Sequence, residues 1–351
     1  MKNILVVLDD LQFDIYHQGM LEYAEQSQIN IYFFLINPLD KHVGVLKKIF
    51  LKWGGQQWKY KWYDQLREQF MSNLIKYNID CVFFINTPYE GSYFINEKVK
   101  KKLEGINCYL LFVDAAANAE CRFTFLDIFK KIFSFEYNDI RFFLKKYNYK
   151  ISFVPVGSVE LIYRNDLKVN DTDKEYDICF VGSSSPKRLI ILNAVAYWCK
   201  KNNKKLCVVG QYWHNSHLLS SILGQLKFRK KYPELSLYVQ NRFIQPNEVA
   251  NIYCRSKICL NIVTDRHKGV NTRTFDILAA GGFQLCDTVD FSGIDLRDQC
   301  DLVLYRDKKD LIEKIEYYLD NENLRLEISQ TGKNLVLKKY LFKHTMKKIF
   351  E

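Results

Sequence analysis

The sequence of 351 residues lacks the motifs that mark several common enzyme classes. No Gly-x-Gly-x-x-Gly follows the first apolar run, and no phosphate-binding loop ends in Gly-Lys-Ser or Gly-Lys-Thr. Gly-x-Ser-x-Gly and His-Glu-x-x-His are absent as well. The usual signatures of dinucleotide-binding enzymes, P-loop enzymes, α/β-hydrolases and zinc proteases are therefore missing.

Long apolar runs and paired cysteines are also missing. The longest apolar runs, such as Ile31–Ile36, fall far short of the ~20 residues that span a bilayer. The start of the chain, Met1–Leu8, predicts a short strand rather than a signal peptide. Ten cysteines occur without a Cys-x-x-Cys pair, and most lie inside apolar runs, where cysteine behaves as a small apolar residue. We therefore expect a protein of the reducing cytoplasm.

The composition is that of a globular protein with a basic surface. Apolar residues make up 48% of the chain, which is ample for a core, and the length favours two domains. The formal net charge is +11, with lysine and arginine spread along the whole sequence. Such an excess fits anionic ligands, an anionic membrane surface or nucleic acid, and does not choose among them. Solvated helix faces account for most of the lysines.

Short apolar runs alternate with helix-like stretches, and this alternation predicts parallel sheets covered on both faces. The polar segment Tyr163–Glu175 is the predicted linker between two doubly wound α/β halves. The predicted strands are Ile4–Leu8, Ile31–Ile36, Cys81–Ile85, Cys108–Val113, Ile132–Phe135, Ile151–Val156, Tyr176–Gly182, Leu206–Gly210, Leu235–Phe243, Ile258–Val263, Phe283–Asp287 and Leu302–Tyr305. The predicted helices are Tyr16–Gln26, Trp62–Tyr77, Asn96–Leu103, Asp139–Lys146, Leu189–Lys200, Leu218–Phe228, Pro246–Arg255, Thr272–Ala280, Asp310–Asp320 and most of Asn323–Phe350.

The stretch from Asn261 to Gly282 carries the strongest functional signal. A buried strand leads into a polar loop, and a helix begins at Asn271 or Thr272, one of which would be its N-cap. Free backbone N–H groups and the helix dipole favour an anion in such a loop. Arg273 adds a cation in the first turn, and Asp276 follows one turn later. This set suits a diphosphate and a ribose diol, although an ordinary strand–loop–helix unit explains the spacing equally well.

Three further segments are candidate sites. Gly182 and Ser183 open a loop before Lys187 and Arg188, and this loop could approach a phosphate. Asp9, Asp10 and His17 follow the first strand, where open α/β sheets bind ligands, and one of them could act as a general base. His214 and His217 are spaced to share a helix face, but no third metal ligand is indicated. Turn, capping and packing roles remain as alternatives for all three segments.

Taken together, the second half resembles the C-terminal domain of CgeB-like glycosyltransferases. The matching stretches are Tyr176–Gly182, Arg188, Phe243 to Gln245 with Glu248, Tyr253 to Ile262 and Asn271–Gly282, while Phe133–Asp139 with Val154 and Pro155 matches in the first half. The resemblance covers most of residues 125–340. It implies the GT-B fold, in which two Rossmann-like domains face each other across a cleft. It assigns residues 1–163 to the acceptor-side domain and 164–334 to the donor-binding domain, with residues 335–351 packing back on the first.

The resemblance also assigns roles to individual residues. Asp276 stands where the family places an acidic residue on the ribose hydroxyls, with Asp in place of Glu. A second acidic position of retaining relatives is Lys268 here, so the stereochemical outcome stays open. The diphosphate would be held by Arg273 and the amides of Asn271 and Thr272, assisted by Lys187 or Arg188. The turn formed by Arg242, Phe243 and Ile244 would pass the nucleobase.

The resemblance implies a glycosyltransferase that moves a sugar from a UDP- or dTDP-linked donor to a hydroxyl acceptor. The acceptor would be a glycan, a lipid-linked sugar or a protein, in surface-glycan or protein glycosylation. No metal, cofactor or nucleic acid is expected. A peripheral contact with the inner membrane face through the basic surface and a homodimer stay open. Two alternatives also stay open: a nucleotide-sugar epimerase on the same fold, and a non-catalytic glycan- or nucleic-acid-binding protein with a degenerate donor site.

Overall fold

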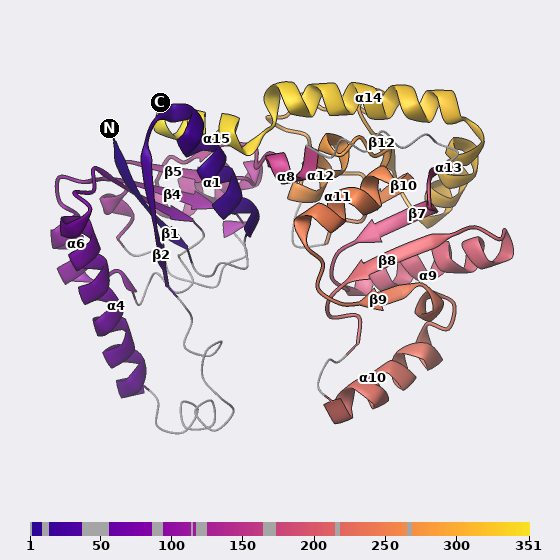
Figure 1. Cartoon of the computed structure of the whole chain (residues 1–351), viewed down its shortest axis with the longest axis horizontal. Coiled ribbons are helices and arrows are strands. Elements are labelled where there is room, and N and C mark those ends of the chain that lie inside the picture. The colour runs from indigo at the N-terminus through magenta and orange to yellow at the C-terminus, as the bar shows by residue number, and fades with distance from the viewer. Residues whose placement is uncertain are drawn as a thin grey trace. The chain divides into compact units, whose positions relative to one another are not determined.

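The computed structural model describes residues 2–8, 14–36, 56–85, 94–113, 115–116, 125–163, 173–214, 218–264 and 269–351 (Figure 1). The chain forms two compact units: residues 1–155 with 345–351, and residues 156–344. Each unit contains a six-stranded sheet in which every strand is paired in parallel with its neighbours. The prediction of two doubly wound α/β halves is therefore confirmed.

The first unit has the strand order β2-β1-β3-β4-β5-β6. Its elements are β1 (Asn3–Leu8), α1 (Asp14–Ser27), β2 (Asn30–Leu35), α4 (Gln56–Lys76), β3 (Cys81–Ile85), α6 (Glu97–Leu103), β4 (Asn107–Phe112), η2 (Leu126–Ile128), β5 (Lys131–Ser134), α7 (Tyr137–Tyr147) and β6 (Ser152–Phe153), followed by the end of α15 (Phe342–Phe350).

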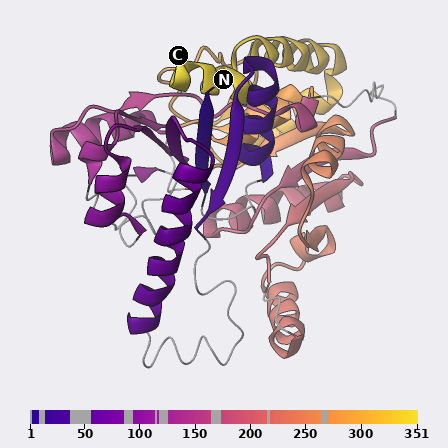
Figure 2. The same cartoon turned by 60° about the vertical axis from the view of Figure 1, so that its left-hand side comes forward.

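Helices cover both faces of this first sheet (Figures 1 and 2). Neighbouring residues of a strand point to opposite faces, and two phenylalanines of β3 show which helix covers which face. The ring of Phe84 lies 6.3 Å from that of Phe70 on α4, whereas the ring of Phe83 lies 5.2 Å from that of Phe350 on α15. Tyr23 of α1 stacks on the same Phe350 at 5.7 Å. The last turns of the chain therefore complete the core of the first unit.

The second unit has the strand order β12-β11-β10-β7-β8-β9. Its elements are α8 (Glu160–Tyr163), β7 (Tyr176–Val181), α9 (Pro186–Lys201), β8 (Leu206–Gly210), α10 (Leu218–Lys231), η4 (Leu235–Leu237), β9 (Val239–Asn241), α11 (Pro246–Cys254), β10 (Ser256–Asn261), α12 (Thr272–Ala279), β11 (Gln284–Asp287), β12 (Val303–Tyr305), α13 (Lys308–Asp320) and α14 (Glu322–Lys339).

The core of the second unit lies on both faces of its sheet. Phe180 of β7 belongs to the same buried cluster as Leu192 of α9 and Ile315 of α13, so these two helices cover one face. Helices α8, α11, α12 and α14 contact one another on the other face. Within the described residues, five of the cysteines expected in strands are fully or almost fully buried, as predicted for small apolar side chains: Cys81, Cys179, Cys207, Cys259 and Cys286. In the part of the chain that the structure describes, no helix is long and apolar enough to cross a membrane.

Two predicted elements differ from the structure. The predicted strand Leu235–Phe243 is a 3-10 turn, η4, followed by the short strand β9, because Leu235 is fully buried against α9. The predicted helix Asn323–Phe350 is interrupted between α14 and α15. At this break, the backbone N–H of Ser158 donates to the carbonyl of Tyr340 (2.9 Å), and the carbonyl of Ser158 accepts the N–H of Phe342 (2.8 Å).

The approach of the two segments at this break is close enough to require glycine. Gly157 has φ +71°, and a Cβ atom at this position would lie only 2.6 Å from the carbonyl carbon of Leu341. Any larger residue would push the strand-like pairing at Ser158 apart. The connection between α14 and α15 is therefore held by its hydrogen bonds to Ser158, which lies in the segment before α8.

Candidate functional site

The candidate site lies in the second unit, where the order of strands along the chain reverses. The chain adds β8 and β9 on one side of β7, then crosses to add β10, β11 and β12 on the other. Open α/β sheets bind ligands at this kind of switch point, outside the carboxyl ends of the strands. Here the switch point is the boundary between β7, which ends at Val181, and β10, which ends at Asn261.

The N-terminus of α12 is fixed at this boundary by amide side chains. Asn271 is the N-cap, as one of the two predicted alternatives has it, and its Oδ1 accepts the N–H of Thr274 at 3.1 Å. The fully buried Asn261 donates Nδ2 to Thr274 Oγ1 (2.9 Å), and Asn271 donates Nδ2 to Asn261 Oδ1 (3.1 Å). Thr272, the first helical residue, therefore presents one of the free N–H groups of a helix start to the loop side.

Arg273 lies across the end of β7. Its Nε donates to the carbonyl of Val181 (2.7 Å) and its NH1 donates to Asn261 Oδ1 (3.2 Å), so the guanidinium joins the two strands of the switch point. Gly182 makes this position available: a Cβ atom there, at φ +154°, would overlap the NH2 group of Arg273. The sequence predicted that Gly182 lets the backbone approach a phosphate. In the structure, the missing side chain of Gly182 leaves room for the guanidinium of Arg273.

Arg188 of α9 lies beside Arg273 and is 6% exposed. Its Nε donates to the carbonyl of Ile262 (2.9 Å) and its NH1 to the carbonyl of Ser183 (2.9 Å), which ties the loop after β7 to the end of β10. Burial, reinforced by the neighbouring charge of Arg273, lowers the pKa of Arg188 to about 9. Both guanidinium carbons lie over the ring of Phe180, at 5.1 Å for Arg273 and 5.4 Å for Arg188.

These two arginines form no ion pair with a carboxylate within the described residues. Their guanidinium groups donate to carbonyl, amide and hydroxyl oxygens, which carry no net charge. Two adjacent cations at least half removed from water, with no carboxylate of the described residues in ion-pair contact, repel each other and favour an added anion. The start of α12 supplies N–H donors at the same place. The chemistry of the site is therefore that of an anion site able to accept phosphate groups.

Lys187 is already engaged by a carboxylate. Its Nζ lies 3.0 Å from Oδ2 of Asp287, a buried residue at the end of β11 that also accepts the N–H of Val263 at 2.7 Å. Of the two cations that the sequence offered as alternatives after Gly182, Lys187 therefore faces β11, and Arg188 lies at the switch point.

Asp276 lies on the inner side of α12. It is 7% exposed, and its Oδ1 accepts the hydroxyl of Ser158 at 2.8 Å. Burial raises the pKa of Asp276 to about 7, while the Ser158 hydrogen bond and the charge of Arg273 act in the opposite direction. The carboxyl group therefore titrates near neutrality in the folded protein. Its predicted role on a ribose stays a prediction.

The segment predicted to pass a nucleobase lies at the carboxyl end of β9. Arg242 donates its N–H to the carbonyl of Gly210 at the end of β8 (3.0 Å), and Gly182 donates its N–H to the carbonyl of Val209 (2.8 Å), so these segments share one edge. The guanidinium of Arg242 is exposed and forms an ion pair with Glu248. Phe243 is 56% exposed and Ile244 is half-buried.

The remaining predicted residues lie elsewhere or outside the description. His17 belongs to α1 of the first unit, where its ring lies 4.3 Å from that of Phe33. Asp9, Asp10, Lys268 and His217 fall outside the described residues, as does most of the predicted linker. His214 lies beside Asn241, which donates its Nδ2 to the carbonyl of His214 at 3.2 Å.

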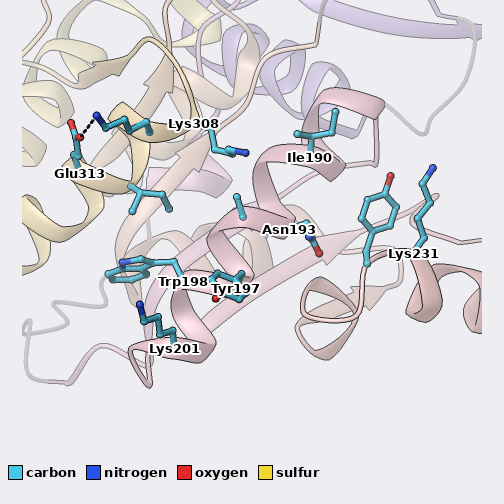
Figure 3. A pocket seen from close by; sticks show the side chains of 12 residues that line it. Ile190, Asn193, Tyr197, Trp198, Lys201, Lys231, Lys308 and Glu313 are labelled. Atoms are coloured by element: carbon cyan, nitrogen blue, oxygen red, sulfur yellow. Dashed lines mark ion pairs between the residues drawn. The ribbon is translucent and has the colours of Figure 1, made fainter.

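A concavity of about 740 Å³ lies on the side of α9 that faces away from the sheet, between α9, α13 and the end of α10 (Figure 3). Four lysines line it, and its one carboxylate, Glu313, is paired with Lys309 at 3.7 Å. Trp198 in its wall is held by a bond from Nε1 to Glu316 (2.7 Å). The lysines are Lys201, Lys231, Lys308 and Lys309.

Sequence reasoning missed three residues that shape the site: Asn261, Ser158 and Asp287. Each is a polar residue at the end of, or next to, an apolar run, and each is at most 5% exposed. A polar residue in that position was the available signal, because a buried polar group must find a partner. The identity of the partner was not available from the sequence.

Known proteins resemble this chain in part of its sequence and in its fold. A family described as glycosyl transferase-like matches residues 193–351. No curated protein matches the sequence. Among solved structures, sucrose-phosphate synthase from Thermosynechococcus elongatus aligns over 99% of this chain and 97% of its own, with a TM-score of 0.67 and 11% identity. A glycosyltransferase from Rickettsia africae aligns over 99% and 96%, with a TM-score of 0.65 and 13% identity.

A third similar structure contains a nucleotide. HepE from Anabaena in complex with UDP aligns over 99% of this chain and 98% of its own, with a TM-score of 0.60 and 10% identity. The same protein in complex with UDP-glucose has a TM-score of 0.61. At these identities the likeness establishes the fold, and the predicted GT-B fold is confirmed.

Proposed function

We propose that the protein is a GT-B glycosyltransferase that takes a UDP- or dTDP-linked sugar as donor and a hydroxyl group as acceptor. The observation that carries the proposal is the pair Arg188 and Arg273, two cations without a carboxylate partner among the described residues, beside the N-terminus of α12. The family matched over residues 193–351 and the nucleotide-bound structures of the same fold support it. The finer CgeB-like assignment stays a prediction.

In the proposed reaction, the donor diphosphate occupies the switch point. Arg273, with its guanidinium fixed by Val181 and Asn261, is preorganised to stabilise the charge that develops on the leaving diphosphate. The N–H groups at the start of α12 add donors, and the helix dipole adds positive potential. Because these groups neutralise the diphosphate, we propose that transfer needs no metal ion.

The other predicted contacts belong to the same proposal. The ribose hydroxyls would approach Asp276, and the nucleobase would pass Phe243 and Ile244. If the sugar is transferred with inversion, the base would come from Asp9, Asp10 or His17 of the first unit. The acceptor is a glycan, a lipid-linked sugar or a protein hydroxyl, and the membrane contact expected from the basic surface is part of the proposal.

A panel of nucleotide-sugars tests this function. The full-length protein is incubated with each donor, with and without EDTA, and free nucleoside diphosphate and epimerised donor are measured together. We expect one donor to release diphosphate slowly to water, faster with an acceptor, and equally with EDTA. Epimer formation without release would replace the transferase with the epimerase. Activity lost in EDTA and restored by manganese would remove the metal-free mechanism.

Binding without turnover is the remaining outcome. If calorimetry shows UDP binding but no donor in the panel is consumed under any condition, the non-catalytic alternative gains and the proposed reaction is wrong. If neither UDP nor dTDP binds, the switch point is not a nucleotide site.

A further inference from the structure

Helix α10 follows β8, the strand that ends at the sheet edge of the candidate site. β8 ends at Gly210 on that edge, and the chain enters α10 at Leu218, eight positions later in the sequence. In Figures 1 and 2 the helix lies beyond β9, at the end of the second unit opposite α14. Of the residues from Ile222 to Lys231, only Phe228 is buried. The rest of this part of the helix therefore faces solvent.

The exposed side of α10 is apolar and basic at once. Ile222 and Leu223 are each 62% exposed, and Leu226 is 56% exposed. Residues four apart lie on the same face of a helix, so Lys230 continues the row of Ile222 and Leu226, and Lys227 continues the row of Leu223. The aliphatic residues thus form one patch with cations at its end.

The charge of this face is of a single sign. The helix sequence Leu218–Lys231 contains no aspartate or glutamate and four exposed cations. Three of them lie beside the aliphatic patch, namely Lys227, Arg229 and Lys230, and the fourth, Lys231, lines the concavity beside α9. None of these three forms an ion pair within the described part of the chain. The patch is therefore complementary to an anionic surface that also has an apolar interior.

We propose that this face of α10, made of Ile222, Leu223, Leu226, Lys227, Arg229 and Lys230, docks the protein on an anionic lipid bilayer. Aliphatic side chains of an interfacial helix enter the boundary between headgroups and acyl chains. Lysine and arginine extend from the same helix to the lipid phosphates.

Other occupants fit the face less well. A second copy of the chain in a symmetric dimer would place two sets of these cations against each other, because such interfaces are isologous. A nucleic acid would use the cations but would leave the aliphatic residues Ile222, Leu223 and Leu226 in water.

The contact has a consequence for the donor site. Because only seven residues separate Gly210, at the edge of the candidate site, from the first residue of α10, docking would hold this edge near the bilayer and near a hydroxyl acceptor carried by a lipid. This consequence rests on the proposed glycosyltransferase function, whereas the bilayer contact itself, which the proposed function includes, can be tested without donor turnover.

Sedimentation of the full-length protein with vesicles tests the contact. The probes are vesicles of phosphatidylcholine with and without phosphatidylglycerol. We expect the wild type to bind only the anionic vesicles, and to bind less as salt increases. Each cation near such a surface contributes roughly fivefold in affinity. The variant Lys227→Gln/Arg229→Gln/Lys230→Gln should therefore lose roughly a hundredfold in the vesicle partition coefficient. The apolar variant Ile222→Ser/Leu223→Ser/Leu226→Ser should lose at least roughly tenfold.

The matched control removes the same number of charges from the concavity on the other side of α9. The variant Lys201→Gln/Lys308→Gln/Lys309→Gln should keep vesicle affinity within about fivefold, because only the long-range attraction changes. All substituted side chains are exposed or line an open surface, so thermal unfolding should be close to that of the wild type. Equal losses in the control and the α10 charge variant would overturn the proposal, since bulk charge would then explain the binding.

Two further results would also overturn it: wild-type protein that ignores anionic vesicles, or an apolar variant that changes the sedimentation of the protein alone from dimer to monomer. Calorimetry with UDP separates this proposal from the proposed function. UDP affinity should be the same in the wild type and in both α10 variants. A wild type that binds vesicles but consumes no donor would remove the function and leave the docking face in place.

Discussion

The role of Arg273 can be tested by replacing it with alanine and with lysine. Its guanidinium is held by two hydrogen bonds, to the carbonyl of Val181 at 2.7 Å and to Asn261 Oδ1 at 3.2 Å, and it lies beside the buried Arg188. In this position, the guanidinium N–H groups that do not bind Val181 or Asn261 would donate hydrogen bonds to the diphosphate. A charge-assisted hydrogen bond contributes about 1.5–3 kcal/mol net. Arg273→Ala should therefore weaken UDP binding by roughly 10- to 150-fold.

The lysine variant separates charge from geometry. Lys keeps the positive charge but lacks the planar fork that reaches two strand ends and a phosphate together. We expect Arg273→Lys to bind UDP with an affinity between those of the wild type and the alanine variant. Arg255→Ala is the matched control: this residue is in the same unit, but it is about half exposed and pairs with Glu175 at the surface. A surface pair of this kind is worth at most about 1 kcal/mol to folding, and its loss should not change UDP affinity.

Isothermal titration calorimetry with UDP measures the effect directly, and thermal unfolding reports whether each variant is folded. Some loss of stability is expected for Arg273→Ala, because the carbonyl of Val181 and the amide of Asn261 lose a partner. An alanine variant that unfolds cooperatively and binds UDP within twofold of the wild type would refute the assignment of the switch point as the diphosphate site.

Two further predictions concern the same region. Gly182→Ala should displace the Arg273 guanidinium and lower UDP affinity in calorimetry. Gly105→Ala in the first unit is the control for backbone strain: it lies at φ +84°, its Cβ would meet nothing within 4 Å, and UDP affinity should stay unchanged. The pKa of Asp276 in the folded protein, about 7, lies above its ordinary value of 3.8. Between these two values the folded protein holds a proton that the unfolded chain has released. The free energy of unfolding therefore falls as pH rises from about 4 to 7. Asp276→Asn, which keeps an acceptor for Ser158, should remove that loss, at most about 4 kcal/mol. Urea unfolding at pH 5 and pH 8 that gives both proteins the same pH dependence would contradict the raised pKa.

Local pattern was sufficient for much of the fold. The apolar runs that predicted strands at Tyr176–Gly182 and Ile258–Val263 correspond to β7 and β10, and the capping signal at Asn271 corresponds to the start of α12. These features depend on residues a few positions apart, and a sequence displays such neighbours directly. The order of alternating strands and helices was visible for the same reason.

Local pattern failed where a distant partner decided the structure. Leu235 opens a run that favours a strand, but it is buried against α9 in a 3-10 turn. The last helix is interrupted because Ser158, more than 180 positions earlier in the chain, pairs with Tyr340 and Phe342. For α10 the sequence predicted a helix, but it did not predict that Ile222, Leu223 and Leu226 would remain in solvent.

The sequence alone was enough to name the residues predicted for the candidate site: a glycine loop, two arginines, a helix start and an acid. Only the tertiary structure decided how they are used. It set Arg188 on the carbonyl of Ile262, 74 positions away, Lys187 on Asp287, and Asp276 under Ser158, 118 positions away. The physical reason is the strand order: because β10 is inserted beside β7, residues that are remote in sequence share one sheet edge, and each buried polar group there binds whichever partner that edge provides.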